Sequence, residues 1–350
     1  MDIVNVVIAG GGSLGHVIAG WLSTRGYDVS ILTRRPLEWS RNLTVKTPDG
    51  IIHASIRNIS DNPAEVIPEA DLILLTVPGY ANASVLSTIK PYLKVGCFLG
   101  AVFCSSGFFF EAFKIIPDNI ILWGFQRVPF IARIVNYGKE ADIRSFKSEL
   151  QIAVERADEK EKEKFRRWIE MSFNTPVTLR SNYLEVSITN SNPILHTARL
   201  YSMFHDWCED VRYDHNILFY EEWTEEAADL LIRMDTELFE LLKHLPVDVN
   251  YLVPLLEYYE STDAVSLAAK LASIKGFKGI RSPMKKDNRG WYPDFSDRYF
   301  TEDFGYSLRF IYELTVKYHV DAPYIDKIYQ WGKGVIDRYG RFSRLDEPRS

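Results

Sequence analysis

Two stretches in the second half of the sequence carry side chains suited to acid/base chemistry. The first contains Asn192, Pro193 and His196, and the second contains Arg298 and Asp303. Asparagine is favoured at a helix N-cap and proline at the first helical position, so we expect His196 in the first turn of a helix. Histidine exchanges protons near neutral pH, and a buried carboxylate on its other ring nitrogen would fix the tautomer. We therefore interpret His196 as a candidate acid/base residue, while Arg298 and Asp303 offer a guanidinium and a carboxylate close together in the sequence.

Arg298 lies in a segment that we expect to form a turn ahead of a helix. Its guanidinium offers a planar fork that matches a carboxylate. Structural interpretations stay open at this point, because isolated histidines are usually structural and Arg298 could simply pair with Asp303. The remaining histidines show no metal-ligand spacing, so we expect no metal site; they are His16, His53, His205, His215, His244 and His319.

A glycine-rich turn near the N-terminus has the pattern G-x-G-x-x-G. It occupies residues 10–15, behind an apolar run at 3–9 that predicts a strand and ahead of a helical pattern at 16–24. Strand, glycine turn and helix in that order are the context of the dinucleotide-binding fingerprint. The sequence therefore predicts a nucleotide cofactor at this turn.

Each residue of the turn has an expected part in holding a cofactor. Gly10 would allow the tight turn, Gly12 would let a pyrophosphate approach the backbone, and Gly15 would let the helix pack closely on the strand. Ser13 and Leu14 would contribute N–H groups at the helix N-terminus, where anions bind.

The predicted second strand, at 28–33, ends in Thr33, Arg34 and Arg35. In the dinucleotide fold this end normally carries an acid for the ribose 2′-hydroxyl. Two arginines and no acid suit a 2′-phosphate, so NADP(H) is favoured over NAD(H), which stays open as a second cofactor.

Strand and helix patterns alternate through residues 1–185. A strand at 71–78 should bring Val77 and Pro78 to the edge of the sheet where the cofactor lies. The other predicted elements are strands at 97–103, 120–125 and 176–180, a hairpin at 43–56 that turns on Asp49-Gly50, and helices at 82–92 and 155–172. This alternation predicts a Rossmann-type α/β domain with a mostly parallel, doubly wound sheet.

Residues 186–345 show a different pattern, and we expect an all-helical substrate and catalytic domain there. The active site should lie in the cleft between the two domains. The predicted helices are 192–208, 224–244, 250–259, 264–274, 304–318 and 323–336, followed by a disordered tail after Arg341.

Composition limits the classes of function. A length of 350 residues suits two domains, and a net charge of −6 argues against nucleic acid and anionic membranes as partners. No stretch is apolar enough to span a bilayer, and the start of the chain does not resemble a signal peptide. Cys97, Cys104 and Cys208 lack a metal or redox spacing, so we expect buried thiols in a cytoplasmic protein.

The glycine fingerprint, Asn192-Pro193-x-x-His196 and the Arg298–Asp303 segment together resemble the octopine/nopaline (opine) dehydrogenase family. The resemblance covers essentially the whole chain, and the two later motifs are the more specific. It implies an NAD(P)-dependent enzyme that condenses an α-keto acid with the amine of an amino acid and reduces the imine. It also implies that His196 and Asp303 are catalytic and that Arg298 and Asn192 bind substrate. Residues 105–108 match the family's substrate loop only loosely and receive no role.

Two alternatives remain. A ketopantoate- or 3-hydroxyacid-type keto-acid reductase has a similar architecture, but those enzymes use an acid/base lysine, and no lysine occurs between Ser181 and Leu242. A non-catalytic NADP-binding module would have no need of the His196, Asp303 and Arg298 set. A homodimer through the helical domain is compatible with the sequence, although no heptad or apolar patch marks an interface.

Overall fold

Residues 3–340 are described by the computed structural model, which divides into two units between Ser187 and Ile188. The tail after Arg341, which the sequence predicts to be disordered, lies outside the described residues. The two units are described separately below.

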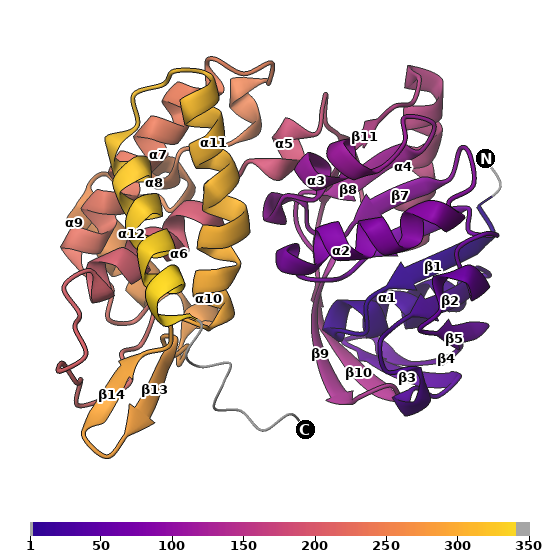
Figure 1. Ribbon diagram of the computed structural model, residues 1–350, viewed down its shortest axis with the longest axis horizontal. Helices are drawn as coiled ribbons and strands as arrows, with labels where there is room; N and C mark the ends of the chain where they lie inside the picture. The colour runs from indigo at the N-terminus through magenta and orange to yellow at the C-terminus, as the bar shows by residue number, and fades with distance from the viewer. Residues whose placement is uncertain (1–2, 341–350) are drawn as a thin grey trace. The chain divides into compact units, whose positions relative to one another are not determined.

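An eight-stranded sheet forms the centre of the first unit (Figure 1). Its neighbours are parallel except for one antiparallel pair, β8 with β11, so the doubly wound prediction is confirmed. Across the sheet the strands are β12 (Val177–Leu179), β11 (Leu150–Glu155), β8 (Ile121–Phe125), β7 (Phe98–Ala101), β6 (Leu72–Leu75), β1 (Asn5–Ala9), β2 (Asp28–Leu32) and β5 (Asn58–Ser60).

Both faces of this sheet are buried, which explains the short apolar runs of its strands. In β1, Val6 and Ile8 point into one core and Val7 and Ala9 into the other, as the two-residue period of a strand requires. Helices α2 (Gly79–Ile89) and α3 (Phe108–Ile115) cover one face, and α1 (Ser13–Ser23) and α4 (Glu159–Phe173) cover the other.

A second sheet in this unit was only half predicted. The expected hairpin on Asp49-Gly50 is confirmed, with Thr47 paired to Gly50, but the other two strands were missed. The four strands lie in the order β4 (Gly50–Ser55), β3 (Asn42–Thr47), β10 (Glu140–Phe146) and β9 (Phe130–Asn136). Helix α1 packs against both sheets, which accounts for its nearly complete burial.

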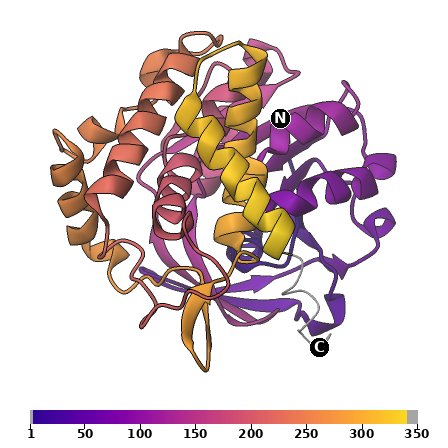
Figure 2. The ribbon, with the colours of Figure 1, turned by 60° about the vertical axis from the view of Figure 1, so that its left-hand side comes forward.

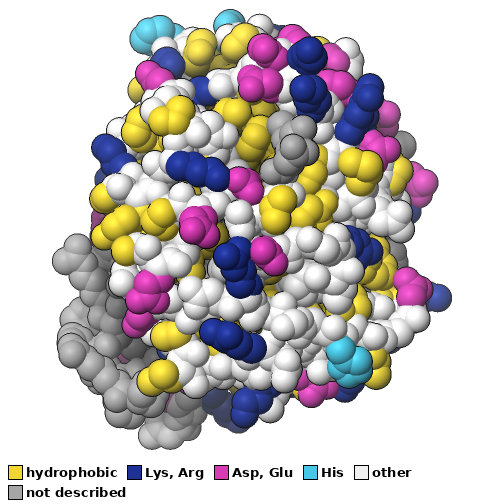
Figure 3. All heavy atoms as spheres, turned by 90° about the vertical axis from the view of Figure 1, so that its right-hand side faces the viewer, with side chains coloured by type: hydrophobic (Ala, Val, Ile, Leu, Met, Phe, Trp, Pro, Cys, Tyr) yellow, Lys and Arg dark blue, Asp and Glu magenta, His cyan; other side chains and the backbone are white. Residues whose placement is uncertain are grey.

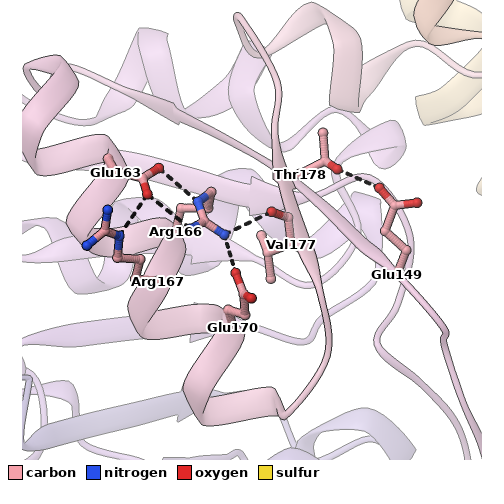
Figure 4. Close-up of polar contacts among 7 residues, drawn as sticks. All are labelled: Glu149, Glu163, Arg166, Arg167, Glu170, Val177 and Thr178. Atoms are coloured by element: carbon pink, nitrogen blue, oxygen red, sulfur yellow. Dashed lines mark hydrogen bonds and ion pairs between the residues drawn. The ribbon is translucent and has the colours of Figure 1, made fainter.

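Helix α4 carries ion pairs between opposite charges that lie three or four residues apart (Figure 4). Arg166 pairs with Glu163 at 2.8 Å and also with Glu170, and Arg167 donates to Glu163 at 2.8 Å. Glu161, by contrast, forms a capping box with Asp158 instead of pairing with Lys164. The helix thus starts at Glu159, and Glu155, where the sequence predicts its start, is the last residue of β11.

The second unit is helical, as predicted, apart from one hairpin (Figures 1 and 2). Strands β13 (Met284–Asp287) and β14 (Gly290–Pro293) correct the expectation of an all-helical domain, because the two lysines of β13 pair with the two aromatic residues of β14 across a tight turn. The helices are α6 (Asn192–Phe204), α7 (Glu225–Leu242), α8 (Leu255–Tyr258), α9 (Ala264–Ser273), α10 (Arg298–Thr301), the π-helical turn η7 (Asp303–Leu308), α11 (Arg309–Lys317) and α12 (Pro323–Tyr339).

Short segments complete the secondary structure. Helix α6 contacts α7, η7 and α12 and is therefore the central helix of the second unit. The remaining segments are the single-turn helix α5 (Leu184–Ser187) and the 3₁₀ turns η1 (Pro36–Glu38), η2 (Pro63–Glu65), η3 (Lys90–Tyr92), η4 (Cys104–Ser106), η5 (Val249–Tyr251) and η6 (Lys275–Phe277).

The surface mixes both signs of charge. On the face shown in Figure 3, lysine and arginine side chains lie among acidic and isolated hydrophobic ones. Among residues 3–340, no helix combines the length and the apolar character that a membrane span needs. Cys97 and Cys104 are buried, but Cys208 is exposed, which corrects the expectation that all three thiols are buried.

Candidate active site

A cavity of about 440 Å³ lies where β1, β2 and β6 end, in the first unit. The carboxyl ends of parallel strands are the usual ligand site of a doubly wound sheet. Its walls include most of the predicted cofactor residues, namely Gly10, Gly12, Thr33, Arg34, Arg35, Val77 and Pro78. Ser13, Leu14 and Gly15 form the first turn of α1, directly behind the glycine turn.

The glycine turn has the backbone geometry that the fingerprint requires. Gly10 has a φ of +131°, which residues with a side chain rarely adopt, and a Cβ on Gly15 would lie 2.1 Å from the carbonyl oxygen of Gly10. A Cβ on Gly12 would meet nothing nearer than 4.0 Å, so a ligand can approach the backbone there. Gly12 is also the N-cap of α1, and its lack of a side chain leaves the first N–H groups available to an anion. These features fit a dinucleotide.

The two arginines after β2 differ in their surroundings. Arg35 pairs with Glu38 at 3.2 Å, and its guanidinium lies 3.8 Å from the centre of the Tyr137 ring. No ion pair joins Arg34 to another side chain in the part of the chain that the structure describes. Arg34 is therefore the less neutralised cation on the cavity wall.

Asp61 and Tyr137 are among the residues of the cavity wall that were not predicted. Asp61 follows β5 and Tyr137 lies in the turn between β9 and β10. Asp61 supplies a carboxylate that could accept from a ribose hydroxyl. Tyr137 could not be found from the sequence, because neither β9 nor β10 was expected.

His16 fixes the turn that carries Tyr137. Its Nδ1 lies 2.8 Å from the carbonyl oxygen of Gly12, and its Nε2 accepts from the N–H of Gly138 at 2.7 Å. Burial lowers the pKa of His16, and the acceptor role of Nε2 requires the neutral ring. This histidine is structural, as expected, and it ties the turn between β9 and β10 to the glycine turn.

In the second unit, Nδ1 of His196 lies 2.8 Å from Oδ2 of Asp303. His196 comes from α6, and Asp303 begins the π-helical turn η7. Both side chains are nearly buried, with exposed fractions of 10% and 13%. The structure thus brings together the two residues that the sequence singles out for proton transfer.

The other nitrogen of His196 has a partner that was not predicted. Nε2 lies 3.1 Å from the hydroxyl of Tyr220, which belongs to the segment between α6 and α7. The His196 ring also packs edge-on against Phe219 and lies 4.8 Å from the Tyr299 ring. A tyrosine in an irregular segment carries no sequence signal for such a contact.

Helix boundaries near His196 differ slightly from the prediction. The N-cap of α6 is Ser191 and not Asn192, because the carbonyl of Ser191 accepts the N–H of Leu195 at 2.9 Å. His196 is consequently the fifth residue of α6, in its second turn. Asn192 is exposed at the first position, one turn before His196 on the same helix face.

Arg298 belongs to a helical turn, which corrects the expectation of an irregular turn. Asp297 caps α10 by accepting the N–H of Tyr299 at 2.9 Å, so Arg298 is the first residue of that helix. Arg298 is exposed and does not pair with Asp303. Its neighbour in α10, Tyr299, contacts the His196 ring, so the helical turn that carries Arg298 packs against the pair.

Two family models match parts of the chain. Residues 179–336 match the family model described as NAD/NADP octopine/nopaline dehydrogenase, alpha-helical domain. Residues 6–101 match the model described as ketopantoate reductase PanE/ApbA. The helical match contains His196, Arg298 and Asp303.

Full-length relatives carry related descriptions. The chain is 27% identical to the tauropine dehydrogenase of Arabella iricolor, over 98% of this chain and 95% of that protein. It is also 27% identical to the opine dehydrogenase of Haliotis discus hannai, over 95% and 91% of the two chains. A structure of octopine dehydrogenase with NADH and agmatine superposes with a TM-score of 0.82 at 23% identity, covering 95% of this chain and 90% of that one. At that identity the superposition establishes the shared fold.

Proposed function

The chain belongs to the octopine/nopaline (opine) dehydrogenase family, and we propose that it catalyses the NADPH-dependent condensation of an α-keto acid with the amine of an amino acid. The product would be a secondary amine that carries both carboxylates. The observation that carries this proposal is the contact between His196 and Asp303 beside an exposed arginine, within the helical unit that matches the family. A proton-transfer pair next to a carboxylate-binding group is what reductive amination requires.

Several residues of the first unit would hold the cofactor. The N–H groups at Ser13, Leu14 and Gly15 suit its pyrophosphate, and Arg34 with Arg35 suits a 2′-phosphate. Val77 and Pro78 would lie beside it at the end of β6. When bound, the reduced cofactor supplies the hydride.

Arg298 is proposed to bind a substrate carboxylate, with Asn192 as a second polar contact. Within residues 3–340 no ion pair engages the exposed Arg298 guanidinium, so it can form a bidentate bond to an incoming carboxylate. Holding that carboxylate fixes the carbon next to it, where the carbonyl becomes the imine.

His196 is proposed to move the protons of the reaction. The amine must lose a proton before it attacks the carbonyl, and the carbinolamine hydroxyl must gain one before it leaves as water. Asp303 accepts from Nδ1 and thereby leaves Nε2 as the nitrogen that takes and returns the proton. One residue of this kind can serve both transfers.

A simple keto-acid reductase is the second candidate, since residues 6–101 match the ketopantoate reductase model. That match covers the nucleotide-binding half only, and the missing lysine between Ser181 and Leu242 argues against it.

An assay of NADPH oxidation separates these candidates. Purified protein is given pyruvate alone and then pyruvate with each of a panel of amino acids. We expect oxidation only when an amino acid is present, and a product with both carbon skeletons by mass spectrometry. Equal oxidation with pyruvate alone would indicate a keto-acid reductase. NADPH binding without oxidation under any condition would indicate a non-catalytic module.

A further inference from the structure

Both ring nitrogens of His196 are engaged, because Asp303 occupies Nδ1 and Tyr220 occupies Nε2. An ionised carboxylate can only accept, so Nδ1 carries the hydrogen, and in the neutral imidazole Nε2 presents its single lone pair. The Tyr220 hydroxyl must therefore donate to Nε2. Asp303, His196 and Tyr220 form one chain of hydrogen bonds that ends on a phenol.

Tyr220 is held in place by aromatic packing. Its ring stacks on Phe277 with centroids 4.1 Å apart and planes 20° from parallel, and it also stacks on Trp223. Only 6% of the residue is exposed. A stacked and buried ring keeps its hydroxyl in one place.

Arg199 fixes the backbone on either side of Tyr220. Its Nε donates to the carbonyl of Phe219 at 3.0 Å, and its Nη2 donates to the carbonyl of Glu222 at 2.7 Å. Arg199 lies three residues after His196 in α6, so one helix positions both the imidazole and the tyrosine segment. Burial lowers the pKa of Arg199 to about 10, although the negative charge of Glu222 raises it in part. The group therefore remains a cation at neutral pH. A buried cation is costly unless its hydrogen bonds are kept, which opposes movement of this segment.

We propose that Tyr220 relays the proton between His196 and the substrate, a role that rests on the proposed function. The lone pair of Nε2 is already bonded to the Tyr220 hydroxyl, and neither partner can readily move away. The oxygen of that hydroxyl keeps lone pairs with which it can accept a proton from the substrate. The proton path then runs through the phenol.

The relay step balances without any oxidant or reductant. The ammonium of the incoming amino acid gives a proton to the Tyr220 oxygen, while the original hydroxyl proton passes to Nε2. One N–H and one O–H bond break, and one O–H and one Nε2–H bond form. The same path in reverse delivers the proton to the carbinolamine hydroxyl as it leaves as water. Burial strongly raises the pKa of Tyr220, so the phenol stays neutral before and after each transfer.

Replacing Tyr220 with phenylalanine tests the relay, because the stacked ring stays and only the hydroxyl is lost. In single-turnover reactions with all substrates bound, we expect Tyr220→Phe to slow NADPH oxidation by about a hundredfold, the typical worth of a proton-transfer group. The loss should persist across the pH profile, with the Michaelis constant of the keto acid and the affinity for NADPH within about threefold of wild type. A rate within about threefold of wild type would overturn the relay. So would a loss that disappears when the pH is changed, because it would mean that Tyr220 only tunes His196.

Tyr213→Phe is the matched control. It removes a hydroxyl in the same unit that donates to the carbonyl of Met203 at 3.0 Å, away from His196. We expect this variant to keep the wild-type rate. A hundredfold loss here as well would show that the helical unit responds to any lost tyrosine hydrogen bond, and would remove the support for the relay.

A second measurement does not depend on activity or on the folding of a variant. Long-range ¹H–¹⁵N spectra of the wild-type protein report the tautomer of each histidine, and the His196→Ala variant assigns the signal. We expect His196 protonated on Nδ1 with Nε2 bare. Protonation on Nε2 would overturn the relay even in an active enzyme. Absence of turnover with every substrate pair would instead contradict the proposed function, while the tautomer still reports on the contact with Tyr220.

Discussion

Nδ1 of His196 lies 2.8 Å from Oδ2 of Asp303, although 107 positions separate the two residues in the chain. Arg298 is only five residues before Asp303, yet the carboxylate pairs with a histidine from another helix. The interpretation that Arg298 simply pairs with Asp303 is therefore wrong. Contact between α6 and η7 brings the His196 and Asp303 side chains together and leaves Arg298 without Asp303 as a partner.

Replacing His196 or Asp303 should abolish most of the turnover. We expect His196→Ala to lower turnover by roughly 10²–10⁴-fold with NADPH binding intact, the usual worth of a general acid/base. Asp303→Asn preserves the shape but removes the charge that orients the ring, so its loss should also be large. The double variant should be little worse than His196→Ala alone, because the two residues act as a unit. Steady-state kinetics of the three variants check this, and losses that multiply would show two independent residues.

Arg298→Lys should separate charge from geometry. The lysine keeps the positive charge but loses the planar fork, so we expect the Michaelis constant of at least one carboxylate substrate to rise about tenfold or more. Cofactor affinity, measured by fluorescence titration, should stay at the wild-type value because Arg298 belongs to the helical unit. Equal weakening of NADPH and substrate binding would contradict its assignment to the substrate.

The fold was largely predictable because its signals are local. Six strands of the eight-stranded sheet were predicted from short, mainly apolar runs, and the turn at Gly10 has a distinctive composition, whereas β5 and β11 were missed. In β10, the charged residues Glu140, Asp142 and Arg144 alternate with the buried ones, and in β9 Arg133 interrupts an otherwise apolar run. Packing against α1 defines both strands. The hairpin of β13 and β14 was missed for a similar reason, since partly exposed two-stranded elements lack a long apolar pattern.

The site was predictable only where a motif marks it. His196, Asp303 and Arg298 stand in motifs, and the glycines stand in a fingerprint. Tyr220 and Asp61 lie in irregular segments and reach their sites through long-range contacts, which no spacing in the sequence encodes. Tertiary packing therefore adds residues to each site that a motif search cannot find.

Cofactor preference should depend on Arg34 more than on Arg35. A charge-assisted bond to a 2′-phosphate contributes on the order of 1.5–3 kcal/mol, roughly ten- to a hundredfold in affinity. We expect Arg34→Ala to weaken NADPH binding by that factor and NADH binding little. Arg35 already pairs with Glu38, so Arg35→Ala should have a smaller effect.

Asp61→Asn should act in the opposite sense. Removing a carboxylate from the cavity wall lowers repulsion toward a 2′-phosphate and removes an acceptor for a 2′-hydroxyl. The ratio of NADPH to NADH affinity should therefore rise in this variant and fall in Arg34→Ala. Fluorescence titration of both cofactors measures the ratio, and equal affinities in the wild type would contradict the NADP preference.

The buried carboxyl of Asp235 should make the stability of the helical unit depend on pH. It accepts from the side chain of Asn190 at 3.0 Å and from the N–H of Leu255 at 2.8 Å, which ties the segment before α6 to α7. Burial raises the pKa of Asp235 to about 6 from an ordinary value of 3.8. Between these values the folded state holds a proton that the unfolded state has lost, so this group lowers the free energy of unfolding as pH rises. Over the whole window the effect is on the order of 2–3 kcal/mol.

Asparagine cannot titrate, so urea unfolding should show Asp235→Asn gaining stability relative to wild type from pH 4 to pH 7. The control is Asp229→Asn, which removes a half-exposed carboxylate on the same helix that pairs with Arg233 at 2.7 Å. A constant difference between wild type and Asp235→Asn would mean that Asp235 is ionised throughout.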